Sequence, residues 1–327
     1  MEFKAGEPAR RSPIELLASV LGGSDEHFAV TGATGWLGAV ALDLLYAAYG
    51  ERASTRVTGY ASAAREVVVA DGRRVEVHPL GELIEQRPAP TTLIHLAYLT
   101  RDKVGVLGVD AYTSQNVAIS AIVLDAIAAF RPPRVIVASS GAVHGSSGRL
   151  EADLRADPYG TLKHLDELAF RSAVHDVGGV CVIPRIFSVA GRRMTKPSSY
   201  ALGSMIQMAR GGGPILVRAQ APVLRSYCGV DEVVALALWA SLRGENTIFE
   251  TGGTVVEVGD LAHLVAQAHR LDPGVLHRTW DPSAPADRYV GDGRVLETLA
   301  ELAGMRLRGL PELIRGTSGW LRGGERA

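Results

Sequence analysis

The chain has 327 residues, 47% hydrophobic and 21% charged, and its 34 lysines and arginines against 35 aspartates and glutamates leave a net charge of -1. These proportions are those of a globular protein with one large domain or two coupled ones, and they provide no basic field for nucleic acid or an anionic membrane. No apolar run approaches a membrane-spanning length, and residues 1–13 lack the apolar core of a signal peptide. We therefore expect a cytoplasmic protein that binds neither nucleic acid nor membrane.

The two cysteines, Cys181 and Cys228, are too far apart in sequence to suggest a metal-ligand pair or a CxxC redox motif. We expect both to be buried free thiols in a reducing compartment. No other pattern in the chain predicts a metal site.

Strands and helices alternate in the first part of the chain. After a short amphipathic segment at 14–21, residues 27–31 have the pattern of a buried strand, and residues 36–49 have helical spacing. Further strands are expected at 56–60, 92–97, 134–138 and 180–183, with helices at 115–130 and 159–174. This alternation predicts an α/β fold with a doubly wound parallel sheet of the Rossmann type.

The pattern changes after Gly191, where glycines and prolines separate shorter elements. We expect residues 1–190 to form a dinucleotide-binding domain, to which a segment at about 225–250 returns. The rest of 191–327 is then a smaller substrate-binding region.

A glycine-rich turn follows the first predicted strand. The sequence Thr31-Gly-Ala-Thr-Gly-Trp-Leu-Gly38 opens the helix at 36–49. Gly32 permits a tight turn, Gly35 lets the backbone approach a pyrophosphate, and Gly38 lets helix and strand pack closely. The free N–H groups at the helix N-terminus attract the anion. A plain glycine-rich turn is the alternative, but the flanking strand and helix favour a dinucleotide site.

The glycine spacing G-x-x-G-x-x-G resembles that of short-chain dehydrogenases/reductases. In that family an acidic residue after the second strand binds the ribose of NAD, whereas here Val57-Thr-Gly-Tyr-Ala-Ser-Ala-Ala-Arg65 contains no acid. Ser62 and Arg65 could bind a 2′-phosphate, so NADP is favoured and NAD remains possible, although Arg65 could equally be a solvated surface charge. The resemblance implies a cofactor site made of Gly32, Thr34, Gly35, Trp36, Leu37, Gly38, Tyr60, Ser62, Arg65, Leu96, Ala97 and Lys163.

Tyr159 and Lys163 are the candidate proton-transfer pair. They follow Asp157-Pro158, and their i, i+4 spacing puts them on one face of the predicted helix. A phenol has a pKa near ~10, so it serves as an acid or base near neutrality only where positive charge favours its phenolate. The lysine and an oxidised nicotinamide would supply that charge.

The strand at 134–138 leads into Ser139-Ser-Gly-Ala-Val-His-Gly145, at a sheet edge where doubly wound proteins bind ligands. This stretch resembles the strand and turn of extended short-chain dehydrogenases/reductases. There a Ser or Thr three residues before the Val of a Val-Tyr-Gly sequence bonds the reacting oxygen, and that position is Ser140. The resemblance implies a catalytic set of Ser140, Tyr159 and Lys163.

Two features depart from the family pattern. His144 replaces the usual tyrosine, and it could either transfer protons or simply fill the same space. The interval from Ser140 to Tyr159 is 19 residues, shorter than expected for a sugar epimerase. We therefore expect a trimmed loop over the substrate.

Two downstream segments point to a nucleotide-sugar substrate through the same resemblance. Pro184-Arg-Ile-Phe-Ser-Val-Ala-Gly191 has Ser188 where an asparagine is usual, and Arg225-Ser-Tyr-Cys-Gly-Val-Asp-Glu-Val-Val234 begins with the arginine that contacts the diphosphate. The alternative for Arg225 is a structural salt bridge, for example with Asp231. Asp231 and Glu250 are expected to be structural. The implied substrate-binding residues are Ser140, Gly141, His144, Ser188 and Arg225.

The implied chemistry is hydride transfer between nicotinamide and a sugar carbon, with Tyr159 exchanging the hydroxyl proton. Dehydration is disfavoured, because dehydratases of the family have Asp-Glu where this chain has Gly141-Ala142. Epimerisation or NADPH-dependent reduction remains, and reduction is slightly favoured. The alternatives are a ketoreductase of a non-sugar carbonyl in secondary metabolism, and a non-catalytic dinucleotide sensor, against which the Tyr159 and Lys163 pair argues.

The helices at 115–130 and 159–174 have apolar faces wider than one sheet contact needs. The family commonly pairs these two helices between subunits. A homodimer is therefore expected.

Overall fold

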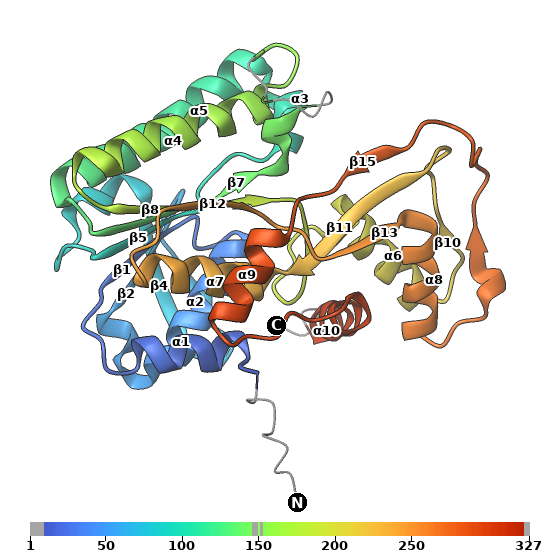
Figure 1. Ribbon diagram of the computed structural model, residues 1–327, viewed down its shortest axis with the longest axis horizontal. Helices are drawn as coiled ribbons and strands as arrows, with labels where there is room; N and C mark the ends of the chain where they lie inside the picture. Colours follow the sequence, from blue (N-terminus) through green and yellow to red (C-terminus); the bar gives the residue numbers. More distant parts are fainter. Residues whose placement is uncertain (1–9, 146–149, 151–152, 324–327) are drawn as a thin grey trace, which may run out of the picture.

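The computed structural model describes residues 10–145, 150 and 153–323. A nine-stranded sheet forms its centre, in the order β12-β8-β6-β5-β1-β2-β4-β3, with β7 paired to β8 (Figure 1). All pairs are parallel except β3 with β4. The prediction of an α/β fold with a doubly wound parallel sheet is confirmed. The strands are β1 Phe28–Thr31, β2 Val57–Ala61, β3 Arg65–Val68, β4 Arg74–Pro79, β5 Thr92–His95, β6 Arg134–Val137, β7 Ser139–Ser140, β8 Val180–Ile186 and β12 Thr247–Glu250.

Helices cover both faces of this sheet (Figure 1). On one face α1 (Pro13–Leu21), α2 (Trp36–Tyr49) and α7 (Val230–Leu242) pack against one another. On the other face lie α4 (Val109–Phe130) and α5 (Pro158–Asp176), preceded by the short α3 (Val104–Leu107). The apolar residues of each layer meet the sheet in two separate buried clusters, so hydrophobic burial fixes the sandwich.

The strand order reverses at β1, which pairs with β2 on one side and with β5 on the other. The connections leaving β1 and β5 diverge to opposite faces of the sheet, which opens a crevice at their carboxyl ends. The turn after β1 and the segment after β5 therefore meet at the place where such folds bind ligands.

A second, smaller lobe extends from the carboxyl edge of the sheet (Figure 1). Its four-stranded sheet holds β13, β11 and β15 in that order, with β9 also paired to β11. Its own buried cluster joins α6, α8 and α10. The elements of this part of the chain are β9 Ser188–Ala190, α6 Ala201–Arg210, β10 Ile215–Leu216, β11 Val223–Gly229, β13 Thr254–Glu257, α8 Val258–Ala268, β14 Leu276–His277, β15 Asp287–Tyr289, α9 Arg294–Leu302 and α10 Leu310–Gly323. Of these, α9 packs back on α7 and β12 of the main domain.

Helix α4 begins at Val109, six residues before the predicted start. Within the described part of the chain it is the one helix long and apolar enough to cross a membrane by length and composition, so the expectation that no apolar run approaches that length is wrong. Its buried face, with Val123 and Ile127, packs against the sheet and α5. Length and composition alone are weak evidence for a membrane span.

Candidate functional site

The turn between β1 and α2 can be built only from glycine at two positions. Gly32 has φ +68°, and a Cβ there would lie 2.6 Å from the backbone of Leu96 and Ala97. A Cβ on Gly38 would lie 2.1 Å from the carbonyl oxygen of Gly32. The turn after β1 therefore packs backbone against backbone with the segment after β5 and with the start of α2, and the close packing of α2 is as predicted from the spacing.

This turn leaves the N-terminus of α2 open to a ligand. The N-cap is Gly35, which offers no side chain to bond the first-turn amides. Across the crevice, the amides of Leu96 and Ala97 donate to Oγ1 of Thr31 at 3.2 and 3.3 Å. A cradle that any Cβ would fill, beside free helix amides, fits the pyrophosphate of a dinucleotide.

His95 lies beneath the cradle and was missed in the sequence. It ends β5, is 2% exposed, and its Nδ1 lies 2.9 Å from Oγ1 of Thr31. Burial, followed by the nearby charge of Lys163, lowers the pKa of His95 to about 3. His95 is therefore a neutral hydrogen-bonding group that fixes Thr31, and only its place at a strand end could have pointed to it.

The residues predicted to select the cofactor lie beyond β2. Tyr60 is 2% exposed and its hydroxyl donates to Gln86 at 3.0 Å, so its side chain belongs to the core, and its carbonyl accepts from Ala33. Ser62 is exposed in the turn, and Arg65 is exposed at the start of β3. Ser62 and Arg65 are thus accessible to a ligand at the end of β2.

Tyr159 and Lys163 lie on the first turns of α5. Asp157 caps this helix by accepting from the amide of Gly160 at 3.0 Å, and Pro158 occupies its first turn. A Cβ on Gly160 would lie 2.4 Å from the carbonyl oxygen of Ala142. This glycine therefore lets the start of α5 pack directly against the turn that follows Ser140.

The Lys163 ammonium is held at the end of β6. Its Nζ donates to the carbonyl of Ala138 at 2.9 Å and lies 3.5 Å from the centre of the Tyr98 ring. Burial lowers the pKa of Lys163 to about 8, against the opposing effect of Asp166 and Glu167. Lys163 therefore remains mainly protonated near neutral pH.

Burial raises the pKa of Tyr159 to about 12, while the hydrogen bond with Ser140 lowers it. The guanidinium of Arg101 also lowers it, from 5.5 Å above the Tyr159 ring. Without further positive charge Tyr159 is thus a neutral phenol near pH 7, able to donate a proton. The structure brings Ser140, Tyr159 and Lys163 together, as the sequence predicted.

Ser140 has a second phenol beside it that sequence reasoning missed. The hydroxyl of Tyr289, at the end of β15, lies 3.2 Å from Oγ of Ser140 and 3.3 Å from the carbonyl of Ile186. Oγ of Ser140 also accepts from the amide of Ala142 at 3.2 Å. Tyr289 is 149 positions from Ser140 and lies in a region without a motif, so no local signal could have paired them.

Arg225 points toward the same place from the second lobe. It pairs with Asp287 at 2.7 Å, and its guanidinium lies 5.9 Å from the centre of the Tyr289 ring. The alternative partner considered from the sequence, Asp231, pairs instead with Arg308, so that suggestion is wrong. The register of β11 with β15 sets Arg225 opposite Tyr289 and explains the contact.

Phe187 packs against Gly141 and directly precedes Ser188 in the chain. A Cβ on Gly141 would lie 2.4 to 2.6 Å from the Phe187 ring, whose other side is packed by Gly291. The ring also contacts Tyr289, with 4.6 Å between centroids. Ser188 begins β9 opposite Tyr227 and is partly exposed.

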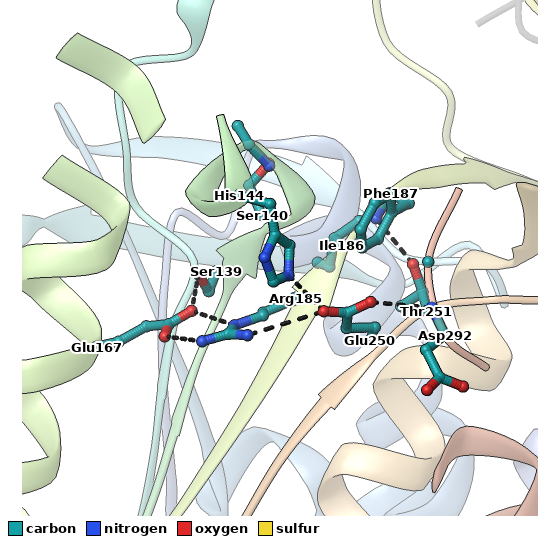
Figure 2. Close-up of polar contacts among 12 residues, drawn as sticks. Ser139, Ser140, His144, Glu167, Arg185, Ile186, Phe187, Glu250, Thr251 and Asp292 are labelled. Carbon is teal, nitrogen blue, oxygen red and sulfur yellow. Dashed lines mark hydrogen bonds and ion pairs between the residues drawn. The ribbon is translucent and has the colours of Figure 1, made fainter. Parts of the chain in front are cut away.

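His144 meets Glu250 rather than filling space. Its Nε2 lies 2.5 Å from Oε1 of Glu250, at the end of β12, and its ring stacks on Phe187 at 6.5 Å (Figure 2). Arg185 lies between Glu250 and the buried Glu167, which also accepts from Ser139 (Figure 2). A polar network therefore runs from His144 through Glu250 and Arg185 to Glu167, beside the end of β7 that carries Ser140.

The fold and these residues define a class of dinucleotide-dependent enzyme, and the chain belongs to the NAD dependent epimerase/dehydratase family, whose model matches residues 28–253. No curated protein matches the sequence.

Solved structures with this fold align with almost the whole length of the chain. A UDP-N-acetylglucosamine 4-epimerase from Methanobrevibacter ruminantium M1 has 19% identity and a TM-score of 0.71 over 92% of this chain and 99% of its own. MoeE5, solved with UDP-glucose and NAD, has 21% identity and a TM-score of 0.69 over 91% and 99%. The dTDP-glucose 4,6-dehydratase DesIV from Streptomyces venezuelae, solved with NAD, has 19% identity and a TM-score of 0.70 over 90% and 97%. At these identities the likeness is one of fold.

Proposed function

We propose that the chain is an NAD(P)-dependent oxidoreductase or epimerase that acts on a nucleotide-activated sugar, with Tyr159 as its acid and base. The convergence of Tyr159, Ser140 and Lys163 beside the glycine turn carries this proposal. A nicotinamide bound there would accept or donate the hydride.

Each residue has a distinct task in this reaction. Tyr159, protonated near neutral pH, donates its proton to the oxygen of the reacting carbon, and Ser140 orients that oxygen by a hydrogen bond. Lys163 would hold the ribose hydroxyls of a bound dinucleotide, and its positive charge would favour the phenolate that Tyr159 becomes. A phenol that starts protonated favours the reductive direction. With Ser62 and Arg65 exposed after β2, NADP remains the favoured cofactor and NAD the alternative.

Arg225 is the proposed contact for the diphosphate of the substrate. Its guanidinium would exchange the single carboxylate of Asp287 for phosphate oxygens, which it can bind in pairs. Gly141, Ser188 and His144 complete the proposed substrate-binding set around Phe187.

A second candidate is an NADPH-dependent ketoreductase of a non-sugar carbonyl compound. Two observations favour it: Asp287 already neutralises Arg225, and the Tyr289 hydroxyl lies against Ser140. Both would suit a smaller, uncharged substrate better than a sugar diphosphate.

Mass spectrometry of small molecules retained after gentle purification tests the proposal and separates the two candidates. A retained sugar nucleotide, or saturable binding of UDP-glucose in calorimetry, supports the nucleotide-sugar function. Retained NADP without binding of UDP-glucose or UDP-N-acetylglucosamine supports the ketoreductase. If neither dinucleotide binds, both proposals are wrong.

We also propose that the chain forms a homodimer through α4 and α5. Val117 on α4 and Leu165 and Leu168 on α5 are large apolar side chains exposed on these two adjacent helices. Sedimentation velocity at micromolar concentration should give a dimer, and replacing Leu165 and Leu168 by glutamate should give monomers.

A further inference from the structure

Glu250 joins three segments of the chain that meet at the candidate site. Its Oε1 accepts from His144 at 2.5 Å and lies 3.7 Å from Arg185, while its Oε2 accepts from the amide of Asp292 at 2.9 Å (Figure 2). The carboxylate is 20% exposed and the imidazole 28%, so both are shielded from much of the solvent. Hydrogen bonds to such a carboxylate are stronger than those between neutral groups.

Each of the three segments carries a residue of the site. The short helix Gly141–His144 begins directly after Ser140 and ends at His144. Arg185 precedes Ile186, whose carbonyl accepts from the Tyr289 hydroxyl. Asp292 lies in the turn that follows Tyr289. A single carboxylate thus connects the positions of Ser140 and Tyr289.

The charges around Glu250 show why a histidine suits this place. Arg185 bonds Glu167 at 2.9 and 2.8 Å through two nitrogens, which leaves Glu250 only its longer 3.7 Å contact. The carboxylate of Asp292 is itself paired with Arg294, and Asp292 brings no positive charge to Glu250. The imidazole of His144 therefore provides the shortest polar contact that Glu250 makes.

We propose that Glu250, acting through His144, is a positioning residue that holds the Gly141–His144 turn so that Ser140 stays hydrogen-bonded to Tyr159. This inference rests on the proposed function, in which Ser140 and Tyr159 act on the reacting oxygen. It gives Glu250 and His144 a role that neither had when read from the sequence.

The ionisation of Tyr159 in the protein saturated with NADP reports this role without any sugar substrate. Tyrosinate absorbance is recorded in a stopped-flow alkaline pH jump, before the protein unfolds, and the Tyr159→Phe signal is subtracted. Since the Ser140 hydrogen bond lowers the pKa of Tyr159, Ser140→Ala should move its ionisation to higher pH. Glu250→Gln should move it in the same direction, by no more than Ser140→Ala does.

The double variants separate positioning from a general loss of structure. Glu250→Gln should cause no further change in the Ser140→Ala background, and His144→Gln, at a partly exposed position, should reproduce Glu250→Gln with a double variant no worse than either. Glu66→Gln, which removes an exposed carboxylate on β3 that pairs with Arg74 of β4, is the matched control and should have no effect.

With a substrate in hand, Glu250→Gln should lower turnover about tenfold at an unchanged cofactor affinity. The proposal fails alone if Ser140→Ala shifts the ionisation of Tyr159 but Glu250→Gln and His144→Gln do not. It also fails alone if Glu250→Gln shifts the ionisation equally in the Ser140→Ala background. If Ser140→Ala itself has no effect, the role of Ser140 in the proposed function falls together with this inference.

Discussion

The cofactor crevice and the rim of the second lobe are built on different principles. At the crevice the shape comes from backbone, because a Cβ on Gly32 or Gly38 would overlap neighbouring main chain. At the rim the shape comes from paired charged and aromatic side chains, such as Arg225 with Asp287 and His144 with Glu250. Backbone geometry restricts which residues a position accepts, whereas a side-chain pair can be exchanged together, so the rim can change with less effect on the fold than the glycines of the crevice.

Tyr159 lies between the crevice and the rim, and Tyr159→Phe should have the largest effect on turnover. Removing the only proton that the phenol carries should lower turnover about 100- to 10,000-fold, with the dissociation constant for NADP(H) unchanged. Single-turnover cofactor absorbance measures the rate. Tyr46→Phe, which alters a phenol on α2 next to Arg73, is the control and should react normally.

Arg225→Ala tests whether the rim recognises a diphosphate. It should weaken UDP-glucose binding about 30- to 100-fold in calorimetry, because charge-assisted hydrogen bonds to phosphate are lost. Asp287→Asn should instead tighten binding, since it removes the carboxylate that competes for Arg225. Unchanged affinity in both variants would argue for the ketoreductase.

His95 tests the crevice through its pH dependence. Its pKa of about 3 in the folded protein lies below the value of ~6.5 expected when unfolded, so the unfolded state binds the proton first as pH falls. The stability due to neutral His95 is therefore fully present above pH ~6.5 and is lost as pH falls toward 3. Between pH 7 and 5 the chain should lose about 2 kcal/mol more than His95→Asn does, measured by urea unfolding. Equal losses would show that His95 is not buried in neutral form.

Gly35→Ala tests the backbone cradle by adding a methyl group to it. The new Cβ would lie 3.2 Å from the carbonyl oxygen of Gly32, within the turn that we propose binds the pyrophosphate. NADPH binding, followed by fluorescence, should weaken about tenfold while the free energy of unfolding changes little. Gly23→Ala, where a Cβ meets nothing within 4 Å, is the control. If both variants bind alike, the pyrophosphate does not approach Gly35.

The difference between the regions also explains what the sequence could predict. Strand β1, the glycine turn and α2 were predictable because local spacing encodes them, and Tyr159 with Lys163 because four residues make one helical turn. Tyr289 beside Ser140, and Glu250 beside His144, were not predictable, because tertiary packing brings them together across 149 and 106 positions. The β3–β4 hairpin was missed because β3 is largely exposed and β4 fully buries only its alternate residues Val75 and Val77, so neither strand has a continuous apolar run.

The packing of Phe187 between Gly141 and Gly291 couples any change at position 141 to the size of the side chain at position 187. An acidic residue at position 141, where the family's dehydratases have one, would place its Cβ 2.4 Å from the Phe187 ring, so the ring would have to shift or be replaced by a smaller side chain. A smaller residue at position 187 would in turn leave a gap beside Tyr289 that lowers the stability of the fold.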